Sequence, residues 1–109
     1  MSMIPINSLI ASAAAAHPRQ PLCWYRLLAG YTRKRRQQLG LSPERAAALA
    51  GLELSQWYAL ESGWVPDPDD TARLRAIAGT LQLMWADYGF LVLMAAAQQY
   101  CPQESAGAA

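Results

Sequence analysis

Four consecutive basic side chains stand at one point of the chain: Arg33, Lys34, Arg35 and Arg36. Guanidinium and ammonium groups bind phosphate oxygens, so a run of this kind could hold a polyanion. The net charge of +1 hides a division that agrees with such a role, because residues 1–45 carry net +6 and residues 46–109 carry net −5. The alternative is that both sets of charges form ordinary solvated faces.

Residues suited to catalysis or to metal binding are sparse. His17 is the only histidine, and it precedes the first strongly helical segment. Carboxylates occur singly except in the stretch 67–70, where helix capping explains them. A nucleophile therefore lacks a base, and no group of ligands has metal-binding spacing. We expect no enzymatic activity, no metal and no cofactor.

Sequence features that bear on cellular location favour the cytoplasm. Cys23 and Cys101 are far apart and form no CxxC motif, so a reduced cytoplasmic setting is the default expectation. The stretch 10–16 resembles the end of a signal peptide, but the basic region that should precede it is missing. The apolar segment 89–97 is too short to cross a bilayer. We expect no membrane association.

The elements that must position the basic run are all predicted to be helices. Apolar periodicity predicts helices at 22–39, 43–50, 54–62, 71–82 and 83–100. Residues 1–21 contain three prolines and are predicted to be a flexible N-terminal arm. Residues 101–109 are predicted to be a disordered tail. The chain is therefore expected to be all-α, with one domain at 22–100.

Local signals mark where these helices begin and end. Gly40 is expected to close the first helix in a left-handed conformation, and Gly51 permits a sharp turn after the second. Ser42 can accept a hydrogen bond from a free backbone N–H at a helix start, and Asp70 or Asp69 can do the same before residue 71.

Two side-chain patterns concern packing. The stem of Arg35 lies on the apolar stripe of the first helix, and its head is expected to reach water. The helix at 83–100 is nearly all apolar, which predicts burial on more than one side and favours a dimer or partner interface. The interface residues expected are Trp85, Phe90, Leu91, Leu93 and Met94.

The spacing of small residues in the middle of the chain carries a family resemblance. The pattern reads Arg33-x-x-Arg36-x-x-x-Gly40-Leu41-Ser42, then Ala46-Ala47-x-x-Ala50-Gly51-Leu52, then Leu60-Glu61-x-Gly63. It resembles the Cro/repressor-type (XRE-like) helix-turn-helix family across roughly residues 27–88. The resemblance implies a five-helix domain in which the helix at 54–62 lies in the major groove of DNA and the helix before it crosses the backbone.

Carried over residue by residue, the resemblance also implies site residues. The expected phosphate contacts are Arg33, Lys34, Arg36, Ser42 and Arg45. The expected base-reading residues are Glu53, Leu54, Ser55, Gln56 and Tyr58. Glu61 is implied to pair with an arginine of the first helix. The chain departs from the family at Pro43, where a glutamine is usual, and in a reading helix without Lys or Arg.

Two functions from different classes follow. The first is a sequence-specific transcriptional regulator that binds double-stranded DNA as a homodimer, with the second motif helix in the major groove. The alternative is a helix-turn-helix module that docks a protein partner, as an adaptor, an antitoxin-like protein or a regulator-binding protein, with weak or no DNA binding. The acidic flanks of the reading helix and the apolar segment 89–97 motivate this alternative.

Overall fold

The computed structural model describes residues 23–98, and all regular secondary structure within that range is helical. The helices are α2 (Trp24–Gln38), α3 (Pro43–Ala50), α4 (Leu54–Leu60), α5 (Thr71–Thr80) and α6 (Trp85–Ala97). The all-α prediction is confirmed for this part of the chain. The predicted arm, the predicted tail and positions 99–100 of the last predicted helix lie outside the described residues.

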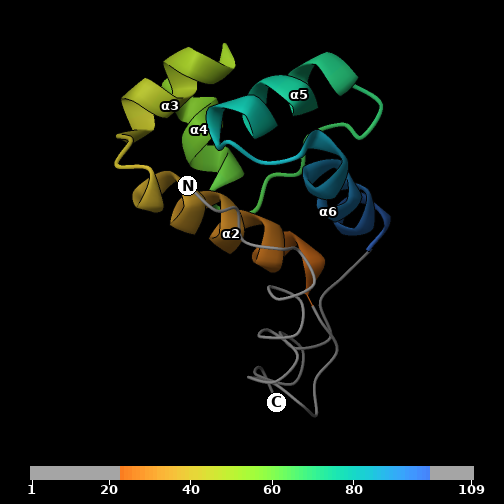
Figure 1. Ribbon diagram of the computed structural model, residues 1–109. Coiled ribbons are helices and arrows are strands. Elements are labelled where there is room, and N and C mark those ends of the chain that lie inside the picture. Colours follow the sequence, from red (N-terminus) through yellow and green to blue (C-terminus); the bar gives the residue numbers. More distant parts are fainter. Residues whose placement is uncertain (1–22, 99–109) are drawn as a thin grey trace, which may run out of the picture.

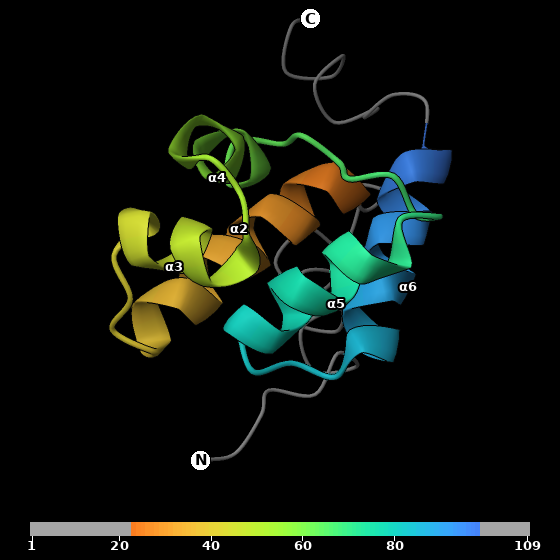
Figure 2. The same ribbon diagram turned by 90° about the horizontal axis from the view of Figure 1, so that it is seen from above.

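Helix α2 is the element on which the others are arranged (Figures 1 and 2). It packs against α6, while α3 packs against both α4 and α5, and α5 packs against α6. The α3–α4 pair and α6 lie on opposite sides of the molecule in both views, with α5 between them. Helices α4 and α6 are therefore well separated in space.

The predicted helix ends around α3 are confirmed. Gly40 and Gly51 both adopt left-handed backbone, with φ of 71° and 70°. The Ser42 hydroxyl accepts a hydrogen bond from the backbone N–H of Arg45 at 3.0 Å, which satisfies one free donor of the first turn. The Asp70 carboxylate does the same for α5, accepting from the N–H of Arg73 at 3.2 Å. Local chemistry therefore fixes the length of α3 and the start of α5.

Helix α4 is shorter than predicted, because it ends at Leu60 rather than at residue 62. The backbone N–H of Trp64 donates a hydrogen bond to the carbonyl oxygen of Ala59, and Gly63 turns the chain with φ of 117°. A Cβ at Gly63 would lie 3.3 Å from Cδ2 of Tyr25, so glycine lets this turn approach α2 closely. The end of α4 is thereby placed beside the N-terminal half of α2.

The core lies between all five described helices and includes Trp57 and Leu60, three positions apart on the inner side of α4. Leu91, predicted to lie at a partner interface, is fully buried in this core. It belongs to the face of α6 that packs within the domain, so it does not contribute to the outer surface. Tyr88 is also fully buried, and its hydroxyl lies 3.1 Å from the Thr32 hydroxyl.

The prediction for the head of Arg35 is wrong. Arg35 is only 3% exposed, and its Nε donates to the carbonyl oxygen of Leu81 at 2.9 Å, at the C-terminal end of α5. Its Nη2 lies 3.5 Å from the carbonyl oxygen of Gln82. The carbonyls that end a helix have no partner within that helix, so they take up a guanidinium that reaches them.

Two further observations concern Cys23 and the hydropathy of the helices. Cys23 is buried and disulfide-bonded, in contrast to the expected reduced state. Between residues 23 and 98, no single helix has the length and hydropathy to cross a membrane; α5 and α6 meet the criterion only together, as a pair bent by 120°.

Candidate nucleic-acid interface

Helix α4 turns one face to solvent, and most of the predicted base-reading residues lie on it. Glu53, Ser55, Leu54 and Tyr58 are exposed, the last two at 39% and 49%. Gln56 is half-buried, and its Oε1 accepts from the backbone N–H of Glu53 at 2.9 Å. The Gln56 carboxamide therefore caps α4, while the other four side chains are available to a partner.

The inner side of α4 is fixed by a buried carboxylate. Glu61 accepts from Arg36 through two hydrogen bonds, from Nε at 2.6 Å and from Nη2 at 3.2 Å. The indole N–H of Trp57 donates to the same carboxylate. We call these three residues the Glu61 network. The implied pairing of Glu61 with an arginine of the first helix is confirmed, and the arginine is Arg36.

Arg36 is held entirely by the protein. Besides its bonds to Glu61, its Nη1 donates to the carbonyl oxygen of Leu41 at 2.9 Å, and its side chain is only 12% exposed. The hydrogen bonds to Glu61 raise the pKa of Arg36 above its usual value. Arg36 therefore positions α4 against α2, and its predicted role as a phosphate contact does not fit its surroundings.

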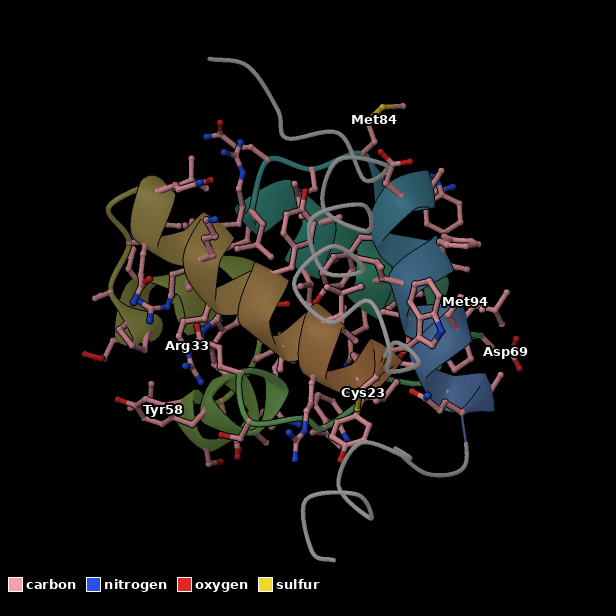
Figure 3. The ribbon with its side chains drawn as sticks, turned by 90° about the horizontal axis from the view of Figure 1, so that it is seen from below. Cys23, Arg33, Tyr58, Asp69, Met84 and Met94 are labelled. Carbon is pink, nitrogen blue, oxygen red and sulfur yellow. The ribbon has the colours of Figure 1, made fainter. Side chains whose placement is uncertain are left out.

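Arg33 is shared between the protein and solvent. Its Nη2 donates to the backbone carbonyl of Glu61 at 3.0 Å, and its Nε lies 3.7 Å from the Glu61 carboxylate. The side chain is still 54% exposed. Figure 3 shows Arg33 and Tyr58 toward the same side of the molecule, away from Met84 and Met94. Arg33 can therefore reach a ligand that contacts α4.

The basic run is thus divided by the helix that carries it. Successive residues of an α-helix point about 100° apart, so four in a row cannot share a face. Arg35 and Arg36 point into the protein, whereas Arg33 and Lys34 are exposed. Of the other predicted phosphate contacts, Arg45 is exposed, and Ser42 is exposed while its hydroxyl caps α3.

One basic residue near this surface was missed by the sequence analysis. Arg26 lies seven positions before Arg33, which is two helical turns, and both side chains line a notch of about 430 Å³ beside the end of α4. Its spacing from Arg33 is the signal that could have identified it.

Only some of the residues predicted to form a partner surface on α6 are exposed. Trp85, Phe90 and Leu93 are exposed, at 41%, 45% and 55%, and Met94 is half-buried. The first three line a groove of about 490 Å³ together with Leu74 and other residues of the α4–α5 linker and α5. Helix α6 and the α3–α4 pair lie on opposite sides of the molecule (Figure 1).

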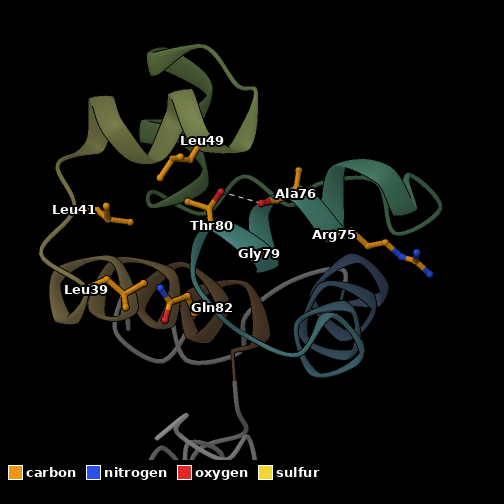
Figure 4. Close-up of a pocket in the computed structure, with 8 residues that line it drawn as sticks. All are labelled: Leu39, Leu41, Leu49, Arg75, Ala76, Gly79, Thr80 and Gln82. Atoms are coloured by element: carbon orange, nitrogen blue, oxygen red, sulfur yellow. Dashed lines mark hydrogen bonds between the residues drawn. The ribbon is translucent and has the colours of Figure 1, made fainter. Parts of the chain in front are cut away.

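A third depression, of about 460 Å³, lies between α2, α3 and α5 (Figure 4). Its apolar walls are formed by Leu39, Leu41 and Leu49. The Thr80 hydroxyl, which also lines it, donates to the carbonyl oxygen of Ala76 at 2.9 Å. The head of Arg75 points away from it. Among the described residues, no group of three or more His, Cys, Asp or Glu side chains could hold a metal ion.

Comparison with known proteins gives no relative from which a role could be transferred. The chain matches no protein-family model, and no curated protein or solved structure is significantly similar to it.

Proposed function

We propose that the protein binds double-stranded DNA as a transcriptional regulator, with α3 and α4 forming a helix-turn-helix and α4 lying in the major groove. One observation carries the proposal: α4 is fixed on its inner side by the Glu61 network while its outer side stays exposed. Base recognition needs a helix whose side chains are held at defined positions, and it needs those side chains uncovered.

The outer face of α4 has suitable groups for reading base edges. The hydroxyls of Ser55 and Tyr58 can donate and accept hydrogen bonds, and Leu54 can contact a thymine methyl group. The Glu53 carboxylate can accept from a cytosine amino group. Because α4 carries no cation, attraction to the backbone must come from the exposed residues beside it, Lys34 and Arg45 among them.

This division of charge has a measurable consequence. Each phosphate neutralised contributes about −0.9 to the slope of log K against log salt concentration. With four exposed cations on α2 and α3, we expect a slope of at most about −4, which is shallow for a DNA-binding protein.

The test is selection of bound sequences from a random duplex pool at low salt, followed by fluorescence anisotropy on the selected site. Lys34→Gln and Arg45→Gln should each weaken binding to all sequences and flatten the salt slope by about 1. Ser55→Ala and Tyr58→Phe should instead change which sequences are selected. Arg75→Gln, on α5, is the matched charge control; because the Arg75 guanidinium lies 4.9 Å from the ring of Trp85 on α6, light scattering must give the same mass for this variant as for the wild type. Absence of any enriched sequence with the wild-type protein would overturn the proposal.

We further propose that two copies associate through the exposed face of α6. Trp85, Phe90 and Leu93 form an apolar surface, with Asp69 in the adjacent groove and the Arg75 guanidinium 4.9 Å from the Trp85 ring. An isologous contact through this surface would place two α4 helices at the outer ends of a dimer. Light scattering after size exclusion should give twice the chain mass for the wild type and one chain mass for Leu93→Asp. A monomeric wild type at high concentration would contradict this arrangement.

A second candidate function is favoured by the chemistry of the same α4 surface. Leu49, Leu54 and Tyr58 are exposed apolar or aromatic residues, and Glu44 and Glu53 add negative charge near them. Such a surface fits a protein partner with an apolar patch edged by basic residues. A heteromeric complex that persists in high salt, together with no enrichment of DNA, would favour this function over DNA binding.

A further inference from the structure

Cys23 stands directly before α2, where the start of that helix meets the end of α6 (Figure 3). The next residue makes that contact, because the backbone N–H of Trp24 donates to Oε1 of Gln98 at 2.7 Å. Gln98 follows the last residue of α6 directly. The two ends of the described domain are therefore in contact, although 74 positions separate the bonded residues in the sequence.

The disulfide of Cys23 joins the same two ends. Cys23 is buried and disulfide-bonded. The sequence contains one other cysteine, Cys101, which lies outside the described residues, so a bond within the chain can join only these two. Cys101 follows Gln98 by three positions. The hydrogen bond between Trp24 and Gln98 is independent of the disulfide, and it agrees with this pairing.

Trp24 connects the disulfide to the exposed face of α6. Its ring meets the ring of Phe90 edge to face, with the centroids 6.0 Å apart and the planes at 88°. Phe90 is 45% exposed and belongs to the surface through which two copies are proposed to associate. Because Trp24 is bonded to Cys23 through the backbone and packs on Phe90, a change at Cys23 acts first on Phe90 and on the end of α6.

We propose that the Cys23–Cys101 disulfide is a redox switch for association through α6: the oxidised chain forms the dimer, and reduction releases the end of α6 and weakens the dimer. The inference rests on the proposed function, because a protein that acts on DNA works where small thiols keep most cysteines reduced. A disulfide in such surroundings is usually transient, and it is either catalytic or redox-sensing.

Reduction proceeds by two thiol–disulfide exchanges. The thiolate of a low-molecular-weight thiol of the glutathione class attacks the sulfur of Cys101, since Cys23 is only 6% exposed. The S–S bond breaks, and Cys23 leaves as a thiolate that takes up a proton from water. A second thiolate attacks the mixed disulfide, which yields the Cys101 thiol and one molecule of the small disulfide. Two electrons pass from the small thiols to the protein, and the small disulfide reverses both steps.

The test uses the full chain, either oxidised with glutathione disulfide or reduced with dithiothreitol. Alkylation of the unfolded chain and mass spectrometry should find no free thiol in the oxidised protein and two in the reduced protein. A disulfide-linked pair of chains in the oxidised sample would overturn the pairing. Cys101→Ser is the matched variant, because it removes the bond and leaves Trp24 and Phe90 unchanged.

The first measurement gives the thermal midpoint and, by analytical ultracentrifugation, the dimer dissociation constant. Reduction should lower the midpoint by about 10 °C or more, because the bond closes a loop around the whole described domain. It should raise the dissociation constant about tenfold, since Phe90 and the end of α6 must then be ordered on association. Cys101→Ser should match the reduced protein with and without reductant. Equal dissociation constants for the two forms would overturn the switch and leave the proposed dimer intact.

The second measurement is amide hydrogen exchange of the oxidised and reduced chains. If both forms are monomeric, the proposed dimer is refuted. Faster exchange in the last turn of α6 on reduction, with α3 unchanged, then supports redox control of α6, whereas unchanged exchange overturns it. Both measurements are made without DNA, so failure to bind duplex would refute the proposed function and leave their outcome unaffected.

Discussion

Helices α4 and α6 are attached to α2 in opposite ways. The seven-residue α4 is held at its end by the Glu61 network, in which Arg36 and Trp57 donate hydrogen bonds to the Glu61 carboxylate. The thirteen-residue α6 is held by apolar side chains on its inner face and exposes further apolar side chains on its outer face. Hydrogen bonds to a buried charge fix orientation, whereas apolar burial supplies stability without direction. The comparison indicates that the contacts of α4 define its orientation, whereas the contacts of α6 mainly bury apolar surface.

The largest effect is expected from removal of the Glu61 carboxylate. Glu61→Ala leaves Arg36 without its partner in a mostly buried site and should lower the free energy of unfolding by about 3 kcal/mol. Urea denaturation followed by circular dichroism measures this. Arg33→Gln is the control, because Arg33 is half-exposed and should cost under about 1 kcal/mol. Equal losses for the two variants would contradict the assignment of the network to Arg36.

A pair of leucines on α6 tests its two faces. Leu91 is fully buried and Leu93 is 55% exposed, although only one residue separates them. Leu91→Ala should cost about 3 kcal/mol of stability through lost burial and the cavity it leaves. Leu93→Ala should cost under about 0.5 kcal/mol in the monomer, since it removes a surface side chain. Thermal melts at low protein concentration separate these effects from association.

A variant of Arg35 tests whether α2 also orients the two C-terminal helices, α5 and α6, through hydrogen bonds. Arg35→Met keeps most of the buried stem but leaves the Leu81 carbonyl without its donor. An unsatisfied buried acceptor costs about 1–3 kcal/mol, so we expect a loss of about 2 kcal/mol. Amide hydrogen exchange should show faster exchange at the end of α5 than elsewhere. Uniform exchange across the helices would contradict a local role.

The smallest effect concerns the polar contact of α6 with α2 and appears at alkaline pH. Burial raises the pKa of Tyr88 far above its ordinary value of 10.0, and it also raises the pKa of Tyr31. As the pH rises, the tyrosine hydroxyls therefore lose their protons at a lower pH in the unfolded chain than in the folded chain. Stability is full below about pH 10 and falls as the pH rises further, by up to about 1.4 kcal/mol per pH unit for each tyrosine.

Tyr88→Phe isolates one of these contributions. It removes the hydroxyl that lies 3.1 Å from Thr32, so we expect a loss of about 1 kcal/mol at neutral pH. The alkaline fall measured by urea titration between pH 8 and pH 11 should become shallower but should not disappear, because Tyr31 remains. An unchanged pH profile would exclude Tyr88 as its source.

Helix boundaries near α3 could be predicted because the signals act locally. Ser42 and Asp70 cap helices through bonds to residues three positions away, and Gly40 and Gly51 adopt the backbone that ends a helix. Such contacts need no knowledge of the fold. The pairing of Glu61 with a first-helix arginine was also anticipated, through the family resemblance.

The fate of each basic residue could not be predicted from the sequence. Arg33, Arg35 and Arg36 have the same chemistry, and only the neighbours brought by α4 and α5 decide which one is buried. For the same reason the sequence could not separate Leu91 from Leu93 in a helix that is apolar all round. Long-range contacts carry this information, and apolar or charged character alone does not.

The corner between α5 and α6 has a consequence for the proposed DNA-binding dimer. Gln82 adopts φ of 54° there, which costs a non-glycine residue about 1 kcal/mol, and Arg35 reaches across from α2 to the carbonyls on either side of that strain. Glu61 attaches α4 to the same helix, so α2 makes polar contacts both with the end of α4 and with the corner that leads into α6. In the proposed dimer, the separation of the two groove-bound helices is then a fixed length, so operators with an added or deleted central base pair should be rejected.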